Sequence, residues 1–195
     1  MALRAHLRLR PDARRRQLLE FGQRHFLNRP YEAISLDQVA EEAGVSKGLL
    51  YHYFATKRDY YMACLHAAVA ELTRMTEPPP DSLPEQQLRA GLDGYLRYVE
   101  ENSDAWQAVL RGSIGSDPEV SAIADGFRET MFRRILSAAP EASPPARLRL
   151  AVKGWIGFVE AVSLDWAARR SPSRPVLVEL LAAELAHLLE SWSEN

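Results

Sequence analysis

The sequence predicts an all-α protein of about nine helices, with an N-terminal helix-turn-helix head and a larger helical body. Apolar residues recur at helical spacing between the proline-rich breaks, and no segment shows a convincing alternating strand pattern. Three short segments near the N-terminus each carry a helix-start signal of their own. Hydrophobic residues make up 47% of the 195 residues, which is enough to bury a core and excludes a wholly disordered chain.

The N-terminal third is predicted to hold four helices. The first covers residues 12–28, the second begins at Ser35, the third begins at Ser46, and the fourth covers residues 57–75. Ser35 and Thr56 each begin a capping-box pattern, and Ser46 is placed to cap the third helix. Gly44 ends the second helix, as a residue in the left-handed region does.

The remaining residues predict the helices of the body. The fifth helix follows the break at residues 78–85 and carries Leu88, Leu92, Tyr95, Leu96 and Val99 at helical spacing. Later helices are expected over residues 104–111, 117–138, 146–169 and 175–192. We place the DNA-binding domain at residues 1–57, and the effector-binding and dimerisation domain at residues 58–195.

Charge is distributed unevenly along the chain. Residues 1–58 contain 11 Lys and Arg against 6 Asp and Glu, whereas the whole chain has a formal net charge of -2. A basic end that faces phosphates, followed by an acidic remainder, is typical of a two-part DNA binder, although clustering by chance is the alternative. The arginine-rich start resembles an organellar presequence but lacks a continuous apolar run, so we expect a mobile basic arm over Arg4–Arg10.

The single cysteine, Cys64, excludes an internal disulfide and favours a reducing, cytoplasmic location. It lies in an apolar run, which favours a core residue over a redox sensor. No apolar stretch approaches the ~20 residues that a membrane span needs, so no membrane partner is expected.

The third predicted helix has two different sides, because successive side chains are separated by ~100°. The inward side holds Leu49, Leu50, Tyr53 and Phe54. The outward side holds the residues that we expect to contact DNA, which are Lys47, Gly48, Tyr51 and His52. Further DNA contacts are expected from Arg14, Arg15, Arg16, Ser35, Ser46 and Lys57. The alternative is a helical hairpin whose aromatic residues only fill a core.

The stretch from Leu18 to Leu65 resembles the head of the TetR family of bacterial transcriptional regulators. Residues 43–57, AGVSKGLLYHYFATK, match the family signature AGVS-x-G-x-LY-x-YF-x-x-K. Phe26, Tyr31 and Ser35 match the family pattern before it, and Pro30 stands where the family usually has glycine. The resemblance covers about a third of the chain at motif level. It implies a homodimer that represses transcription at a pseudopalindromic operator and leaves it when a small molecule binds.

The last two predicted helices are apolar on more than one face, so each must be covered on two sides. A four-helix bundle made from two copies of this pair would cover them, whereas a monomer that buries both stripes internally is the alternative. The residues expected to form the dimer interface are Gly154, Gly157, Ala161, Leu177, Leu181, Leu185, Leu188 and Trp192.

An effector pocket is expected between helices of the body, with mostly apolar walls and a few polar groups. The candidate wall residues are Tyr95, Tyr98, Trp106, Leu110, Phe127, Met131, Trp155, Phe158, Glu160 and Val162. Each of them is also a candidate for ordinary core packing. Glu160 is the one charge between Trp155 and Leu164, which suits either ligand binding or a salt bridge across a dimer. The aromatic content favours an apolar or amphipathic small molecule.

Two other classes of protein were compared with this interpretation. An enzyme is disfavoured because the five histidines are scattered along the chain. The GSIGS segment at Gly112–Ser116 follows no strand and lacks the lysine of a phosphate loop. We therefore expect no catalytic residue, no metal and no cofactor. A helical interaction module without DNA binding is the other alternative.

Overall fold

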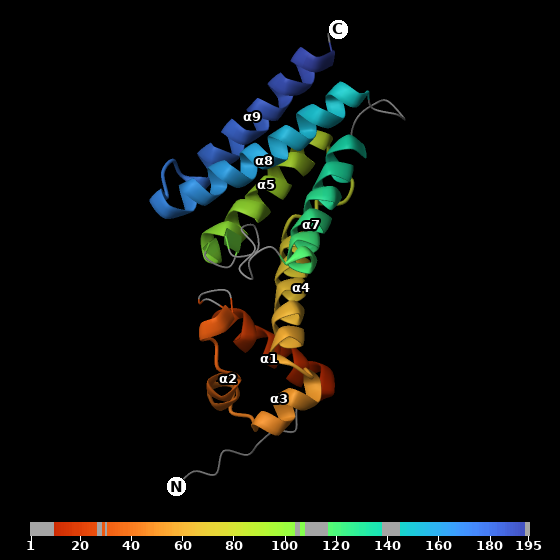
Figure 1. The fold of residues 1–195 in the computed structure, drawn as a ribbon. Helices are drawn as coiled ribbons and strands as arrows, with labels where there is room; N and C mark the ends of the chain where they lie inside the picture. The colour runs from red at the N-terminus through yellow and green to blue at the C-terminus, as the bar shows by residue number, and fades with distance from the viewer. Residues whose placement is uncertain are drawn as a thin grey trace. The chain divides into compact units, whose positions relative to one another are not determined.

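The protein is all-α, as the sequence predicts. The computed structural model describes residues 10–26, 29, 31–103, 106–107, 117–137 and 145–193, and these residues form eight α-helices, one 3-10 helix and no strand (Figure 1). The chain divides into two compact units, Met1–Ala68 and Val69–Asn195. The division falls within α4 (Lys57–Met75), eleven residues after the functional boundary expected at residue 57. Each unit is described by itself below.

The first unit contains short helices that are bounded by local signals. Its elements are α1 (Pro11–Phe26), a 3-10 turn (Tyr31–Ala33), α2 (Leu36–Glu42), α3 (Lys47–Tyr53) and the first part of α4. Gly44 ends α2 with a φ of 67°, in the left-handed region that favours glycine. The Ser46 hydroxyl accepts a hydrogen bond from the Leu49 N–H at 3.2 Å. Thr56 and Asp59 cap the start of α4 reciprocally, each accepting the other's backbone N–H at 3.0 Å.

The capping box expected at Ser35 is wrong. Ser35 is the N-cap residue of α2, but its side chain forms no capping hydrogen bond and is exposed. Water competes for an exposed serine hydroxyl, so the sequence pattern alone does not ensure the bond.

Aromatic side chains form the core of the first unit. Phe26 at the end of α1 packs edge-on against Tyr60 and Tyr61 of α4, with ring centroids 5.4 and 5.3 Å apart. The Tyr60 hydroxyl donates a hydrogen bond to the Leu18 carbonyl. At Gly22, an added Cβ would lie 2.5 Å from the Cys64 Sγ. The close contact between α1 and α4 therefore requires glycine at this position.

The second unit consists of the end of α4 and four long helices. These are α5 (Pro84–Glu101), α7 (Pro118–Ser137), α8 (Ala146–Arg169) and α9 (Arg174–Ser193). Helix α5 packs against both α8 and α9, and α7 packs against α8 (Figure 1). An added Cβ at Gly94 would lie 1.9 Å from the Met75 carbonyl oxygen, so glycine is required where α5 meets the end of α4. The Arg174 guanidinium joins the start of α9 to α5 through Asp93 and Glu100, at 2.8 and 2.6 Å.

The long helices agree closely with the predicted ranges. Helices α4 and α8 have the expected bounds, and α7 and α9 each differ from prediction by one residue at either end. The short helix expected over residues 104–111 falls mostly outside the described residues. No described helix combines the length and the apolar character needed to cross a membrane.

Candidate functional site

Helix α3 is anchored on one side and open on the other. Leu50 is fully buried and Phe54, the residue after the helix, is 3% exposed. The four residues predicted to read DNA, Lys47, Gly48, Tyr51 and His52, are all exposed. The Tyr51 side chain is 40% exposed, and a Cβ added at Gly48 would have no atom within 4 Å. The outward side of α3 is therefore a free surface of the first unit, with room for close approach by a partner.

The cation on this surface already has a weak partner. The Lys47 ammonium lies 2.7 Å from the Asp37 carboxylate, and the hydrogen bond to Asp37 raises the pKa of Lys47. Both side chains are more than half exposed, and exposed ion pairs of this kind contribute little to stability. The ammonium also lies 6.0 Å from the Tyr51 ring centroid. Lys47 can exchange Asp37 for a phosphate at little cost.

The other predicted phosphate contacts lie in different settings. The half-buried Lys57 points its ammonium over the Tyr31 ring, 4.5 Å from the centroid, and donates to the Glu32 carbonyl at 3.5 Å. The Lys57 ammonium therefore lies beside the 3-10 turn, within the first unit. Ser35 and Ser46 are exposed at the starts of α2 and α3.

The arginines of α1 are also accessible. Arg15 and Arg16 are exposed, and Arg15 lies over the Phe54 ring, 5.4 Å from its centroid. Arg14 is half-buried and donates to the Gln17 side chain at 2.6 Å. Of the arm predicted over Arg4–Arg10, only Arg10 is among the described residues. Together with Lys47 and Lys57, these arginines give the first unit several cations that carry no strong buried ion pair.

The second unit contains a cavity of about 600 Å³. Its lining residues come from the start to the middle of α5 and α8, and from the middle to the end of α7 and α9. The cavity therefore lies where α5 and α8 begin and where α7 and α9 end. Most of the wall is apolar and includes Leu92, Phe127, Met131, Val152, Trp155 and Leu185. A volume of this size is within the roughly 300–1,000 Å³ range of ligand pockets in proteins.

The structure brings only some of the predicted pocket residues to this cavity. Those that line it are Tyr95, Phe127, Met131 and Trp155. Tyr98 and Trp106 are buried in the core, and Val162 is half-buried, but none of them lines the cavity. Phe158 is 45% exposed on the outer side of α8, so it points away from the interior. Leu110 lies outside the described residues.

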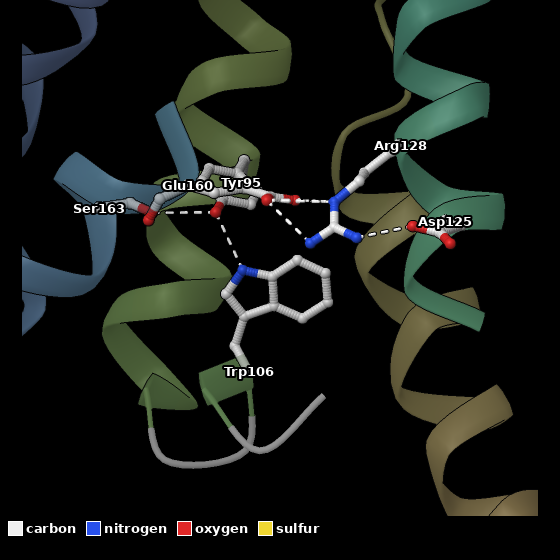
Figure 2. A network of polar contacts seen from close by, with 6 residues as sticks. All are labelled: Tyr95, Trp106, Asp125, Arg128, Glu160 and Ser163. Carbon is white, nitrogen blue, oxygen red and sulfur yellow. Dashed lines mark hydrogen bonds and ion pairs between the residues drawn. The ribbon is translucent and has the colours of Figure 1, made fainter. Parts of the chain in front are cut away.

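A polar network joins α5, α7 and α8 beside the cavity (Figure 2). The Tyr95 hydroxyl accepts from the Trp106 indole N–H at 2.9 Å and lies 2.9 Å from the Ser163 hydroxyl. Ser163 donates to the Glu160 carbonyl oxygen at 2.9 Å, so Tyr95 must donate to Ser163. Burial raises the pKa of Tyr95. The Tyr95 ring thus faces the cavity, whereas its hydroxyl is fully used inside the protein.

Glu160 has a partner within its own chain. Arg128 of α7 donates to both Glu160 carboxylate oxygens, from Nε at 2.9 and 3.1 Å and from Nη2 at 3.0 Å (Figure 2). Arg128 also meets Asp125 at 2.7 Å. The Glu160 side chain is 13% exposed and does not line the cavity. Glu160 therefore forms an ion pair between α7 and α8 of the same chain. The sequence analysis had expected it to bind a ligand or to form a salt bridge across a dimer.

Arg134 is a cavity residue that the sequence analysis missed. It is half-buried on α7, and its Nη1 donates to the Thr76 carbonyl at 3.1 Å and to the Thr76 hydroxyl at 3.3 Å. The signal that would have found it is helical spacing, since Phe127, Met131 and Arg134 follow the i, i+4, i+7 pattern of one helix face.

The expected dimer residues divide into two groups. Gly154, Gly157 and Ala161 are exposed on α8, and added Cβ atoms at the two glycines would meet nothing within 4 Å. The leucines expected on α9 are instead turned into the core of their own chain: Leu177, Leu181 and Leu185 are 4%, 1% and 2% exposed, and Leu188 is half-buried. The side chain of Trp192 lies outside the described residues. On α9 the large apolar residues that are exposed are Val176 and Leu180, which the sequence analysis did not select.

Metal-binding chemistry has no visible basis in the part of the chain that the structure describes. There, no three His, Cys, Asp or Glu side chains are grouped so that they could hold a metal ion.

Comparisons with known proteins match both units. Residues 18–63 match the family described as bacterial regulatory proteins, tetR family, and residues 84–188 match the tetracyclin repressor-like C-terminal domain. The transcriptional activator FasR of Mycolicibacterium smegmatis is 32% identical over 117 residues, which are 59% of this chain and 53% of FasR. This chain thus matches about half the length of that relative. The repressor KstR of Rhodococcus jostii is 28% identical over 157 residues, 80% of this chain and 74% of KstR.

Solved structures of the same family share the fold. A tetR-family regulator from Streptomyces coelicolor has a TM-score of 0.83 at 30% identity, covering 95% of this chain and 84% of that one. FadR from Bacillus subtilis, whose structure is a complex with stearoyl-CoA, has a TM-score of 0.66 over 89% of this chain and 96% of FadR; at 15% identity this likeness shows the fold alone. With its head and body both matched, the chain belongs to the TetR family and is a DNA-binding transcription regulator.

Proposed function

We propose that the protein is a homodimeric repressor that binds a pseudopalindromic operator and leaves it when a small apolar or amphipathic effector enters the body. The observation that carries this proposal is the two-sided α3 helix, in which Leu50 is fully buried while Tyr51 and His52 face solvent. A short helix held in this way is what a major groove admits.

The proposed DNA contacts divide into base-reading and phosphate-binding groups. Tyr51 and His52 offer a ring and polar atoms to base edges, and Gly48 lets the backbone approach closely. Lys47 and Lys57 offer ammonium groups to phosphates, since neither is held in a buried ion pair. The arginines at 14–16 and the hydroxyls of Ser35 and Ser46 would add phosphate contacts, so that DNA binding belongs to residues 1–57.

A dimer is supported by the outer faces of α8 and α9. Of the six large hydrophobic side chains that are exposed in the described residues, four lie on these two helices: Leu150, Phe158, Val176 and Leu180. Gly154 and Gly157 on α8 leave open space beside Phe158, which would let a helix of a second copy come close. Two copies of the pair would form a four-helix bundle and hold two heads about 34–36 Å apart, one turn of DNA.

The cavity of the second unit is the proposed effector site. Its mostly apolar wall suits a molecule that is itself largely apolar. Binding would favour one arrangement of the dimer over another, and only an effector that binds the two arrangements with different affinity can shift that equilibrium. We propose that the arrangement favoured by the effector no longer fits two successive grooves.

DNA binding is tested with a labelled duplex from the promoter upstream of the protein's own gene, by fluorescence anisotropy at several salt concentrations. We expect Tyr51→Ala to weaken binding by about 1–3 kcal/mol, roughly 5- to 150-fold. Lys57→Ala should weaken binding and reduce the dependence on salt. Lys153→Ala, which removes an exposed lysine of α8, is the matched control and should leave binding unchanged. Promoter binding that survives the combined Tyr51→Ala and Lys57→Ala change contradicts the assignment of these residues.

The dimer is tested by light scattering after size-exclusion chromatography. Leu180→Asp, combined with Val176→Asp, places carboxylates on the proposed interface and should produce monomers. Leu83→Asp makes the same kind of change at an exposed leucine that precedes α5, and should remain dimeric. A double variant that elutes as a stable dimer would move the interface elsewhere.

The direction of regulation needs a separate measurement, because the named relatives include both an activator and a repressor. A dimer that occupies an operator can repress by blocking access alone, which is why we propose repression. A reporter gene under the protein's own promoter should lose expression when the protein is supplied and regain it with the Tyr51→Ala variant. Higher expression with the wild-type protein would show activation.

A further inference from the structure

The cavity has charged groups only at one place in an otherwise apolar wall. The charged residues that line it are Glu85, Arg89, Arg134 and Glu190. They come from the start of α5, the end of α7 and the end of α9, and Glu85 and Glu190 are exposed, so this end of the cavity faces solvent. Whether this opening favours an anion, a cation or a neutral group depends on which of these charges already has a partner.

Two of the four charged residues, Glu85 and Arg89, contact each other, and Arg89 also pairs with Glu179, so this group carries one excess negative charge. The Arg89 Nε donates to both carboxylate oxygens of Glu179 at 3.0 Å, and its Nη1 lies 3.3 Å from the Glu85 carboxylate. Arg89 is thus held by two carboxylates and offers little to a ligand. The Glu85 side chain is 85% exposed, so water also solvates its carboxylate.

Arg134 is different because its partners are neutral. Its Nη1 donates to the carbonyl and the hydroxyl of Thr76, and no carboxylate among the described residues lies within ion-pair distance of its guanidinium. A guanidinium has five N–H donors, so those on Nε and Nη2 remain available. A half-buried cation without a counter-charge is costly next to an apolar wall, and a bound anion would remove that cost.

Thr76 fixes the position of this guanidinium. Thr76 is 3% exposed, and its hydroxyl lies 3.0 Å from the carbonyl oxygens of Leu72 and Thr73 in the last turn of α4. The hydroxyl donates to these carbonyls and accepts from Arg134. Because the side chain is already ordered by this contact, a ligand does not have to supply the full entropy cost of immobilising it.

Glu190 does not balance Arg134. It is exposed near the end of α9, where water solvates its carboxylate. Among the described residues, the opening therefore holds one ordered cation without a carboxylate partner, Arg134. It also holds two excess negative charges on exposed carboxylates, one from the Arg89 group and one from Glu190.

We infer that the effector is an anionic amphiphile, with an apolar chain in the cavity and a carboxylate or phosphate group paired with Arg134. A planar guanidinium binds such oxyanions through two parallel N–H···O bonds, a geometry that favours them over neutral hydroxyls. This inference rests on the proposed effector role of the cavity and adds the chemical class of the ligand.

The test uses four probes that share a dodecyl chain and differ in their heads: dodecanoate, dodecyl phosphate, dodecanol and dodecylammonium. Binding to the full-length protein is measured by calorimetry, at concentrations below micelle formation. The wild-type protein should bind dodecanoate or dodecyl phosphate about 10- to 100-fold more tightly than dodecanol, the range for hydrogen bonds to a charged group. Comparison of the two anions identifies which head is preferred.

Two variants on the same helix isolate the role of Arg134. Arg134→Gln should abolish the preference for an anion, whereas Arg133→Gln should keep it, because Arg133 is exposed and paired with Glu129 at 2.8 Å. Arg134→Lys retains the charge and should retain part of the preference, which keeps the test valid if Arg134→Gln is unstable. A preference that persists in Arg134→Gln overturns the inference.

Other outcomes also decide the matter. The inference is overturned if all four probes bind with equal affinity, or if none of them binds. It is also overturned if dodecylammonium binds most tightly and this binding is lost in Glu190→Gln. The proposed function is tested separately: it fails if the protein shows no salt-sensitive binding to its promoter when no probe is present. Release of the promoter by dodecanol and dodecanoate alike would leave the proposed function standing and remove only the anionic class.

Discussion

The hydroxyl of Tyr95 is the centre of the buried polar network, and replacing Tyr95 by phenylalanine removes that one atom. The Trp106 indole N–H would lose its acceptor at 2.9 Å, while Ser163 would keep its own bond to the Glu160 carbonyl. A buried donor left without a partner costs about 1–3 kcal/mol. For a chain of this length, that cost lowers Tm by roughly 2–12 °C, at about 2–4 °C per kcal/mol.

The measurement is urea unfolding followed by tryptophan fluorescence, with the free energy of unfolding extrapolated to water. Tyr98→Phe is the matched control. Tyr98 is buried on the same helix, but no described residue hydrogen-bonds to its hydroxyl, so the change should cost less than about 0.5 kcal/mol at neutral pH. If the two variants lose the same stability, the hydrogen bonds of Tyr95 do not stabilise the body and the reasoning is refuted.

Three further changes test packing and charge. Gly22→Ala should destabilise the protein by about 1–3 kcal/mol or more in thermal unfolding, because the new Cβ would lie 2.6 Å from the Tyr60 ring; a fully stable variant would contradict this close contact. Gly126→Ala on the open side of α7 should instead stabilise it by about 0.5–1 kcal/mol, and a loss there would show an unseen constraint. Burial raises the pKa of Tyr98 to about 12 from 10.0, so the folded protein keeps a proton that the unfolded chain releases between these values. The free energy of unfolding should therefore fall as pH rises from 10 to 12, by at most about 1.4 kcal/mol per pH unit from this residue, and Tyr98→Phe should show a shallower decline in alkaline unfolding curves.

The sequence predicted the fold well wherever local signals were redundant. Helix α4 begins at a reciprocal Thr56–Asp59 cap and ends before a run of prolines, and both limits were visible in the residues. At Ser35 the predicted helix start is confirmed, but the capping bond is not: Ser35 is the N-cap residue of α2, yet its hydroxyl makes no capping bond. Capping depends on local geometry and on competition with water, which a residue pattern does not contain.

The candidate site could be predicted only in part, for a reason specific to α8 and α9. Both helices are apolar on two faces, and periodicity cannot say which face meets the core of its own chain. The structure buries Leu181, which was expected at the dimer interface, and exposes Leu180, for which no role was predicted. Likewise, Phe158 looks like a pocket residue until the neighbouring helices are placed. The outward side of α3 was easier, because its short length and the buried Leu50 leave only one orientation.

The satisfied hydroxyl of Tyr95 has a consequence for selectivity. Because that oxygen is hydrogen-bonded to Trp106 and Ser163, the wall of the cavity at Tyr95 can contact a ligand by van der Waals packing but gives it no hydrogen bond from this hydroxyl. Discrimination there rests on fit alone, and a single methylene is worth only about 1–3 kcal/mol in such a setting. We therefore expect a series of ligands that differ only in chain length to act on the regulator, with potency that changes gradually along the series. The regulator would then respond to the total concentration of this class of compound more than to the concentration of any one member.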